Sequence, residues 1–165
     1  MWKALWLAAL AALCAAQLPD LKIERTAPEQ PLPFSHKQHV STNGMKCQQC
    51  HPVPDPGDFA TLPKTALCMG CHSSVKTDSP HIKKLAGLHA ENKRVPWAGV
   101  YRVPDWVSFS HRKHVTSGAS CEDCHGPVAE RAVLRREKDL SMAACMDCHR
   151  AKRASNDCLL CHDQR

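Results

Sequence analysis

The pentapeptide Cys-x-x-Cys-His occurs five times in this chain of 165 residues and accounts for ten of its eleven cysteines. Two thiols separated by two residues can add to the vinyl groups of one porphyrin, while the histidine that follows directly can ligate the iron. We number the pentapeptides sites 1 to 5 in chain order, and they begin at Cys47, Cys68, Cys121, Cys145 and Cys158. The pattern predicts five covalently bound haem c groups.

At each site, two cysteines would attach the porphyrin and one histidine would be an axial ligand of the iron. The predicted attachment residues are Cys47, Cys50, Cys68, Cys71, Cys121, Cys124, Cys145, Cys148, Cys158 and Cys161. The predicted axial histidines of the pentapeptides are His51, His72, His125, His149 and His162.

Other uses of cysteine explain this pattern less well. Structural zinc binds to pairs of Cys-x-x-Cys knuckles, but five knuckles leave one unmatched, and zinc requires no histidine after each pair. Disulfide bonds suit an exported protein, yet they do not require five identical spacings. A thioredoxin-like motif would occur once, within a βαβ pattern. Haem attachment accounts for every feature of the repeated motif.

Six histidines lie outside the pentapeptides, enough to give every iron a second imidazole. They are His36, His39, His81, His89, His111 and His114. An iron ligated by protein on both faces is closed to substrate and suited to electron transfer. The count therefore favours an electron carrier over an enzyme.

Four of these histidines form two His-x-x-His pairs, and residues three apart lie on neighbouring positions of a helical turn. We expect each pair to ligate two different haems, His36 at site 1 and His111 at site 3. The sequence leaves open which haems His39 and His114 ligate.

His81 and His89 are the candidates for the fifth distal ligand. We favour His89, because His81 follows Pro80 at an expected helix start. A methionine could take this position and raise the haem potential; the candidates are Met45, Met69, Met142 and Met146.

An internal repeat organises the chain. The segment Phe34-Ser-His-Lys-Gln-His-Val40 returns as Phe109-Ser-His-Arg-Lys-His-Val115, and two pentapeptides follow each copy. We predict one domain over residues 17–165. It contains diheme units at 34–72 and 109–149, a connector at 73–108, and a terminal haem within 150–165.

The composition predicts a mainly α fold with extensive irregular loops and little or no sheet. Twelve prolines limit regular structure, and the few aromatic residues make a thin core without haem. We expect short helices over 81–92, 127–138 and 141–150. The haems themselves would form most of the core.

The N-terminus predicts export. Residues 1–16 combine Lys3 with an uncharged apolar run too short to span a bilayer, as in a signal peptide. The mature chain would be periplasmic, with membrane association through the N-terminus as an alternative: Cys14 could carry a lipid, or the segment could remain uncleaved. The net charge of +6 does not indicate nucleic-acid binding, because each haem adds two propionates.

The His-x-x-His pairs placed before the pentapeptides resemble the class III multihaem cytochromes c, the cytochrome c3 and c7-like group, over residues 33–162. In that family the first histidine of such a pair ligates the next haem and the second ligates another. Residues 95–150 are also similar to the pentahaem subunit of alternative complex III, through Val95-Pro-Trp, Pro104-Asp-Trp and Leu140-Ser-Met-Ala-Ala-Cys145. That resemblance implies a histidine near Tyr101, where this chain has tyrosine.

The sequence therefore predicts an exported carrier with five low-potential bis-histidine haems that passes electrons between redox proteins, with no nucleic acid as partner. Two alternatives stay open. The chain could be a subunit of a membrane quinol-oxidising respiratory complex, or a reductase of small molecules at one open haem.

Overall fold

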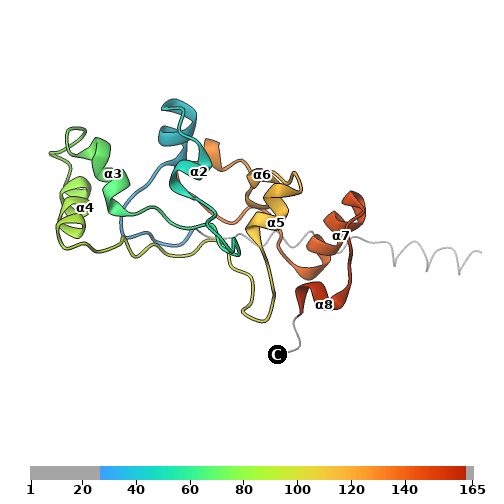
Figure 1. Cartoon of the computed structure of the whole chain (residues 1–165). Coiled ribbons are helices and arrows are strands. Elements are labelled where there is room, and N and C mark those ends of the chain that lie inside the picture. The colour runs from blue at the N-terminus through green and yellow to red at the C-terminus, as the bar shows by residue number, and fades with distance from the viewer. Residues whose placement is uncertain (1–26, 163–165) are drawn as a thin grey trace, which may run out of the picture.

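The computed structural model describes residues 27–162, and within that range the chain forms helices, turns and irregular segments with no β-strand. The predicted mainly α class is confirmed. The elements are the π-helix η1 (Lys37–Thr42), α2 (Cys47–Cys50), α3 (Thr65–His72), α4 (Pro80–Ala90), α5 (His111–Thr116), α6 (Cys121–His125), the 3-10 helix η2 (Val128–Glu130), α7 (Met142–Lys152) and α8 (Cys158–Cys161). Figure 1 shows them strung out from α4 at one end to α7 and α8 at the other.

Every pentapeptide lies on a short helix, and several of these helices begin at a side-chain cap. The side chains of Ser120, Ser141 and Asp157 accept hydrogen bonds from backbone N–H groups at the starts of α6, α7 and α8. Such caps satisfy donors that have no partner within the helix. Short polar residues therefore fix where three of the haem-binding helices start.

The apolar core is small and lies where α3 packs against α4. Among the described residues, the buried apolar side chains are Leu32, Leu85 and Val95. Pro80 stands in the first turn of α4, where its missing N–H is harmless. The predicted helix over 81–92 is confirmed with slightly different ends. So small a core agrees with the expectation of a thin interior.

The two repeats interlock reciprocally. Helix η1 of the first repeat docks on the segment after site 3, where the Lys37 N–H donates to the Arg131 carbonyl over 2.9 Å. Helix α5 of the second repeat docks on the segment after site 1, where the Arg112 N–H donates to the Gly57 carbonyl, also over 2.9 Å. Because equivalent backbone groups make both bonds, the repeats exchange the same contact in both directions.

Close packing accompanies the second of these contacts. Gly57 has φ +90°, and a Cβ built there would lie 2.4 Å from Cβ of Arg112. Only glycine tolerates both that dihedral angle and that approach. The Arg112 guanidinium also donates to the Val53 carbonyl over 3.2 Å. Glycine at position 57 therefore permits α5 to approach the loop after site 1.

The helix expected over residues 127–138 does not form, so that prediction was wrong. Only η2 is helical there, and the following backbone is irregular. Arg131 binds Glu137 through two hydrogen bonds of 2.5 and 2.9 Å, and its carbonyl is used by η1. The long-range contact with η1 takes backbone groups that a continuous helix would have used internally.

No helix within residues 27–162 is both long and apolar enough to cross a membrane. The predicted signal peptide and Cys14 lie outside the described residues. The predictions of export and of N-terminal anchoring therefore stay predictions.

Candidate haem-binding sites

The cysteines of all five pentapeptides are free thiols. Across residues 27–162, no three side chains of the types His, Cys, Asp or Glu converge as they would around a metal ion held by protein alone. The ten cysteines of the pentapeptides are therefore not paired in disulfides. They are available for attachment to porphyrin.

Four of the five pentapeptide histidines face a second imidazole that comes from a His-x-x-His pair. The ring centres of His36 and His51 lie 6.4 Å apart with an interplanar angle of 16°, and those of His111 and His125 lie 6.5 Å apart at 6°. His39 faces His72 at 6.3 Å, and His114 faces His149 at 6.1 Å. Each pair of the sequence thus divides its two rings between two sites.

These separations fit two imidazoles on opposite faces of one metal ion. A ligating imidazole nitrogen lies about 2.0 Å from a transition metal, and the ring centre lies roughly 1.1 Å behind it, so two coaxial rings are about 6.2 Å apart. The four observed separations fall between 6.1 and 6.5 Å. The residues at sites 1 to 4 therefore fit a bis-histidine haem.

Backbone carbonyls orient most of these rings. The Nδ1–H of His39 donates to the Ser35 carbonyl over 2.9 Å, and that of His114 donates to the Ser110 carbonyl over 2.8 Å. The same kind of bond holds His51, His72, His111 and His149. A proton fixed on Nδ1 leaves Nε2 unprotonated, which is the tautomer that a metal requires.

Burial keeps two further rings neutral. The pKa of His36 is lowered to about 4, mainly because the ring is buried and to a smaller extent because the imidazoles of His51 and His39 are nearby. The pKa of His125 is lowered mainly by burial and to a smaller extent by the nearby His111 and His51. The Nδ1 atom of His36 is buried without a hydrogen-bond partner among the described residues. A neutral imidazole near pH 7 can donate its lone pair to iron.

A phenylalanine positions each His-x-x-His pair. Phe34 stacks on His39 with ring centres 4.4 Å apart and meets His36 edge-on at 4.9 Å. Phe109 packs in the same way, at 4.4 Å from His114 and 4.8 Å from His111. Both phenylalanines belong to the repeated segments of the sequence, where spacing alone indicated no role for them. Their position two residues before the first histidine was the available signal.

In space, neighbouring sites follow one another along the molecule in the order 2, 1, 3, 4, 5. Four thiols each have a thiol of the neighbouring site close enough to raise their pKa, and the pairs are Cys68 with Cys50, Cys121 with Cys47, Cys124 with Cys148, and Cys145 with Cys161. In each pair, burial raises the pKa of the first thiol most, and the second thiol raises it further. Figure 1 shows α3, α2 and α6 in the same order, with α7 and α8 together at the far end.

Sites 1 and 3 meet where the two repeats join. The thiol of Cys47 lies close enough to that of Cys121 to raise its pKa, after the larger effect of burial. His51 is also near enough to His125 to contribute to its lowered pKa. The first site of each unit therefore lies at the centre of the molecule, and site 2 lies on the outer side of site 1.

Tyr101 lies beside site 3. Its hydroxyl donates to the His125 carbonyl over 2.8 Å and accepts from the Glu137 N–H over 3.1 Å. Its ring meets the His125 ring edge-on at 4.6 Å. Tyr101 thus braces the histidine of a site whose opposite face already has His111. It does not occupy the position of a missing distal ligand.

His81 and His89 are not brought to any other histidine ring within the described residues. Both lie exposed on α4, and the His89 Nδ1 is 3.3 Å from the Thr65 hydroxyl of α3. Helix α4 packs on α3 at one end of the molecule, whereas α8 with site 5 lies at the other. The structure therefore does not bring either residue to site 5.

Comparison with known proteins agrees with this geometry. The family model described as class III cytochrome C matches residues 15–99, and the model described as cytochrome c7 and related cytochrome c matches residues 107–163. The menaquinone reductase, multiheme cytochrome c subunit, of Nitratidesulfovibrio vulgaris (strain Hildenborough) is 35% identical over an alignment of 161 positions, which covers 81% of this chain and 77% of that protein. The resemblance to class III multihaem cytochromes inferred from the sequence is confirmed.

Proposed function

The chain belongs to the class III cytochrome c family, and on that premise we propose that it is an exported pentahaem cytochrome that carries electrons between redox partners. The observation that supports this most strongly is the set of four imidazole pairs, each 6.1 to 6.5 Å apart. When bound, haem c supplies reversible one-electron chemistry. Bis-histidine ligation without methionine favours low potentials.

The residues of the chain perform three tasks in this function. The ten pentapeptide cysteines tether the haems, and the carbonyl groups that accept from Nδ1 hold the imidazoles in the ligating tautomer. The reciprocal contact between the repeats sets site 1 against site 3. Sites 2 and 5 are then the ends of the series, and redox partners would approach them. The predicted residues 17–165 form one functional unit in this proposal.

The ligand pairs can be tested by removing one imidazole at a time. In the holoprotein, His39→Ala should open the iron at site 2, which adds about one high-spin ferric haem per protein because a strong ligand is lost. Electron paramagnetic resonance would measure it. Combining His39→Ala with Cys68→Ala and Cys71→Ala removes site 2, so the added signal should vanish.

His114→Ala is the matched control in the second repeat, and its signal should depend on site 4. A high-spin haem that persists in the His39→Ala variant after site 2 is removed would contradict the assignment of His39. No added high-spin haem in either variant would contradict bis-histidine ligation at sites 2 and 4.

A second candidate is a permanent subunit of a quinone-linked membrane complex. The relative named as a menaquinone reductase subunit favours it, because the match covers most of both chains. That name indicates electron flow toward the quinone, whereas the resemblance to alternative complex III implies quinol oxidation. Within such a complex, one end of the series would face the other subunits.

Fractionation separates the two candidates. If the chain is a subunit, an affinity-tagged copy should be recovered from detergent-solubilised membranes together with partner proteins, and the preparation should reduce a menaquinone analogue. If it is a free carrier, at least about nine-tenths should be recovered in the periplasmic fraction without stoichiometric partners. An untagged strain processed in parallel controls for contaminants.

A further inference from the structure

Site 5 differs from the other four sites in its imidazole supply. All eleven histidines of the chain lie within the described residues, so none is hidden in the termini. Eight of them form the four facing pairs of sites 1 to 4. His162 at site 5 has no facing imidazole among the described residues, and only His81 and His89 are left over.

The two remaining histidines cannot reach site 5. Both are on α4, whose neighbour is α3, and the ring of His89 is held near Thr65. Figure 1 shows α4 at one end of the molecule and α8, with α7, at the other. Their exposure also contrasts with the half-buried positions of His36, His39, His111 and His114. They therefore differ in both place and environment from the four histidines that face a partner.

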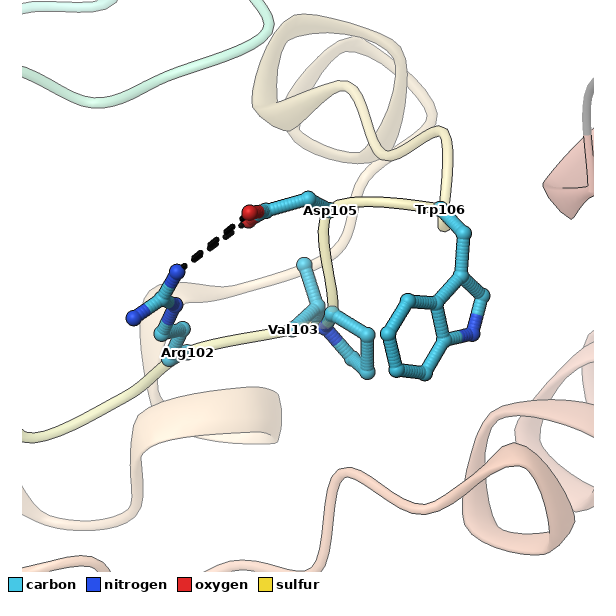
Figure 2. Close-up of a pocket in the computed structure, with 5 residues that line it drawn as sticks. Arg102, Val103, Asp105 and Trp106 are labelled. Atoms are coloured by element: carbon cyan, nitrogen blue, oxygen red, sulfur yellow. Dashed lines mark hydrogen bonds and ion pairs between the residues drawn. The ribbon is translucent and has the colours of Figure 1, made fainter. Parts of the chain in front are cut away.

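The surroundings of α8 supply no substitute imidazole. The Ser108 N–H donates to the Cys161 carbonyl over 2.8 Å, which ties α8 to the loop that precedes Ser108. This loop encloses a shallow hollow of about 330 Å³ lined by Arg102, Val103, Pro104, Asp105 and Trp106. Figure 2 shows Arg102 paired with Asp105, at 3.3 Å, and the Trp106 ring apart from that pair. The lining contains no histidine, methionine or cysteine.

Exposed apolar side chains surround site 5. Leu159 and Leu160, the two residues between its cysteines, are 60% and 56% exposed, and Trp106 is 71% exposed. Site 4 adjoins it through the Cys145 and Cys161 thiols, and α8 lies at one end of the described part of the chain (Figure 1). A haem held at this site would lie beside exposed side chains at one end of the molecule.

We infer that the haem iron at site 5 has an exchangeable sixth position that small external haem ligands can occupy. The ligand class is diatomic molecules for the ferrous iron and small anions for the ferric iron. This inference rests on the proposed haem attachment at site 5. The sequence predicted two histidine ligands for every iron. The inference instead gives four irons with two histidine ligands and one iron, at site 5, with a single histidine ligand.

The test is carbon monoxide titration of the dithionite-reduced holoprotein. Haem content by pyridine haemochrome should be about five per protein, and about one carbon monoxide should bind per protein because one iron in five lacks a distal ligand. Fewer than five haems would count against the proposed pentahaem protein. Five haems with no carbon monoxide bound would overturn only the inference about site 5.

Variants locate the open iron. Replacing Cys158, Cys161 and His162 by alanine should abolish carbon monoxide binding, whereas His111→Ala should raise it to about two per protein by opening site 3. The double variant His81→Ala/His89→Ala should bind the same amount as the parent. If the parent binds none and this double variant binds one, the fifth distal ligand is one of these histidines and the inference is wrong.

Methionine provides the remaining discriminating variant. The ferric parent should lack the near-infrared magnetic circular dichroism band of histidine–methionine ligation, and Met142→Leu/Met146→Leu should bind carbon monoxide as the parent does. A methionine band that disappears in this variant would overturn the inference, because the chain itself would then supply the sixth ligand.

Discussion

The chain without haem should show no cooperative folding transition. Ordering one residue costs about 1 to 2 kcal/mol, whereas burying one large aliphatic side chain stabilises by about 1.5 to 3 kcal/mol. The buried apolar side chains among residues 27–162 are Leu32, Leu85 and Val95, so side-chain packing cannot offset the entropy. The measurement is far-ultraviolet circular dichroism of the haem-free chain during thermal and urea unfolding.

The covalently loaded protein is the control, and it should unfold in one cooperative transition. Replacing the ten pentapeptide cysteines by alanine gives a haem-free chain without interfering disulfides. A sharp transition in this variant would show that packing between polypeptide segments suffices for folding. It would then contradict the proposal that haem forms the core.

Removing the haem at site 3 should interrupt rapid electron transfer between sites 1 and 2 and sites 4 and 5. Site 3 adjoins site 1 through the Cys121 and Cys47 thiols and adjoins site 4 through the Cys124 and Cys148 thiols. In the variant Cys121→Ala/Cys124→Ala, electrons placed at site 2 should no longer reach sites 4 and 5 quickly. We expect the rate of this transfer to fall by at least about tenfold, equivalent to about 1.4 kcal/mol of barrier.

A photoreductant on α4 would measure this rate. Lys83 is exposed there, and Lys83→Cys gives an attachment point at the site 2 end. After a flash, the fast phase of the haem absorbance change should report reduction of all sites in the parent. In the site 3 variant it should report reduction of sites 1 and 2 only.

The matched control removes site 5, at the far end of the series, with Cys158→Ala and Cys161→Ala. Sites 1 to 4 should still equilibrate in the fast phase, because no interior member of the series is lost. Equal fast phases in the site 3 and site 5 variants would contradict the order 2, 1, 3, 4, 5.

Features that depend on residues close together in the chain could be predicted from the sequence. The class III family, the mainly α class and the helix at α4 followed from pentapeptides, His-x-x-His pairs and a proline at a helix start. The helix predicted over 127–138 failed because its prediction used local propensity alone. In the structure, the Arg131 carbonyl is used by Lys37, and the Arg131 side chain binds Glu137. Long-range contacts of this kind leave no local signal.

The sequence by itself determined the attachment chemistry, the inventory of histidines and the duplication of the two units. Only the tertiary structure decided that His39 faces His72 and His114 faces His149, and that His81 and His89 lie far from site 5. The physical reason is that a thioether site needs residues adjacent in the chain, whereas a distal ligand must come from elsewhere in it. The reciprocal docking of η1 and α5 sets those distances, and spacing along the sequence does not encode it.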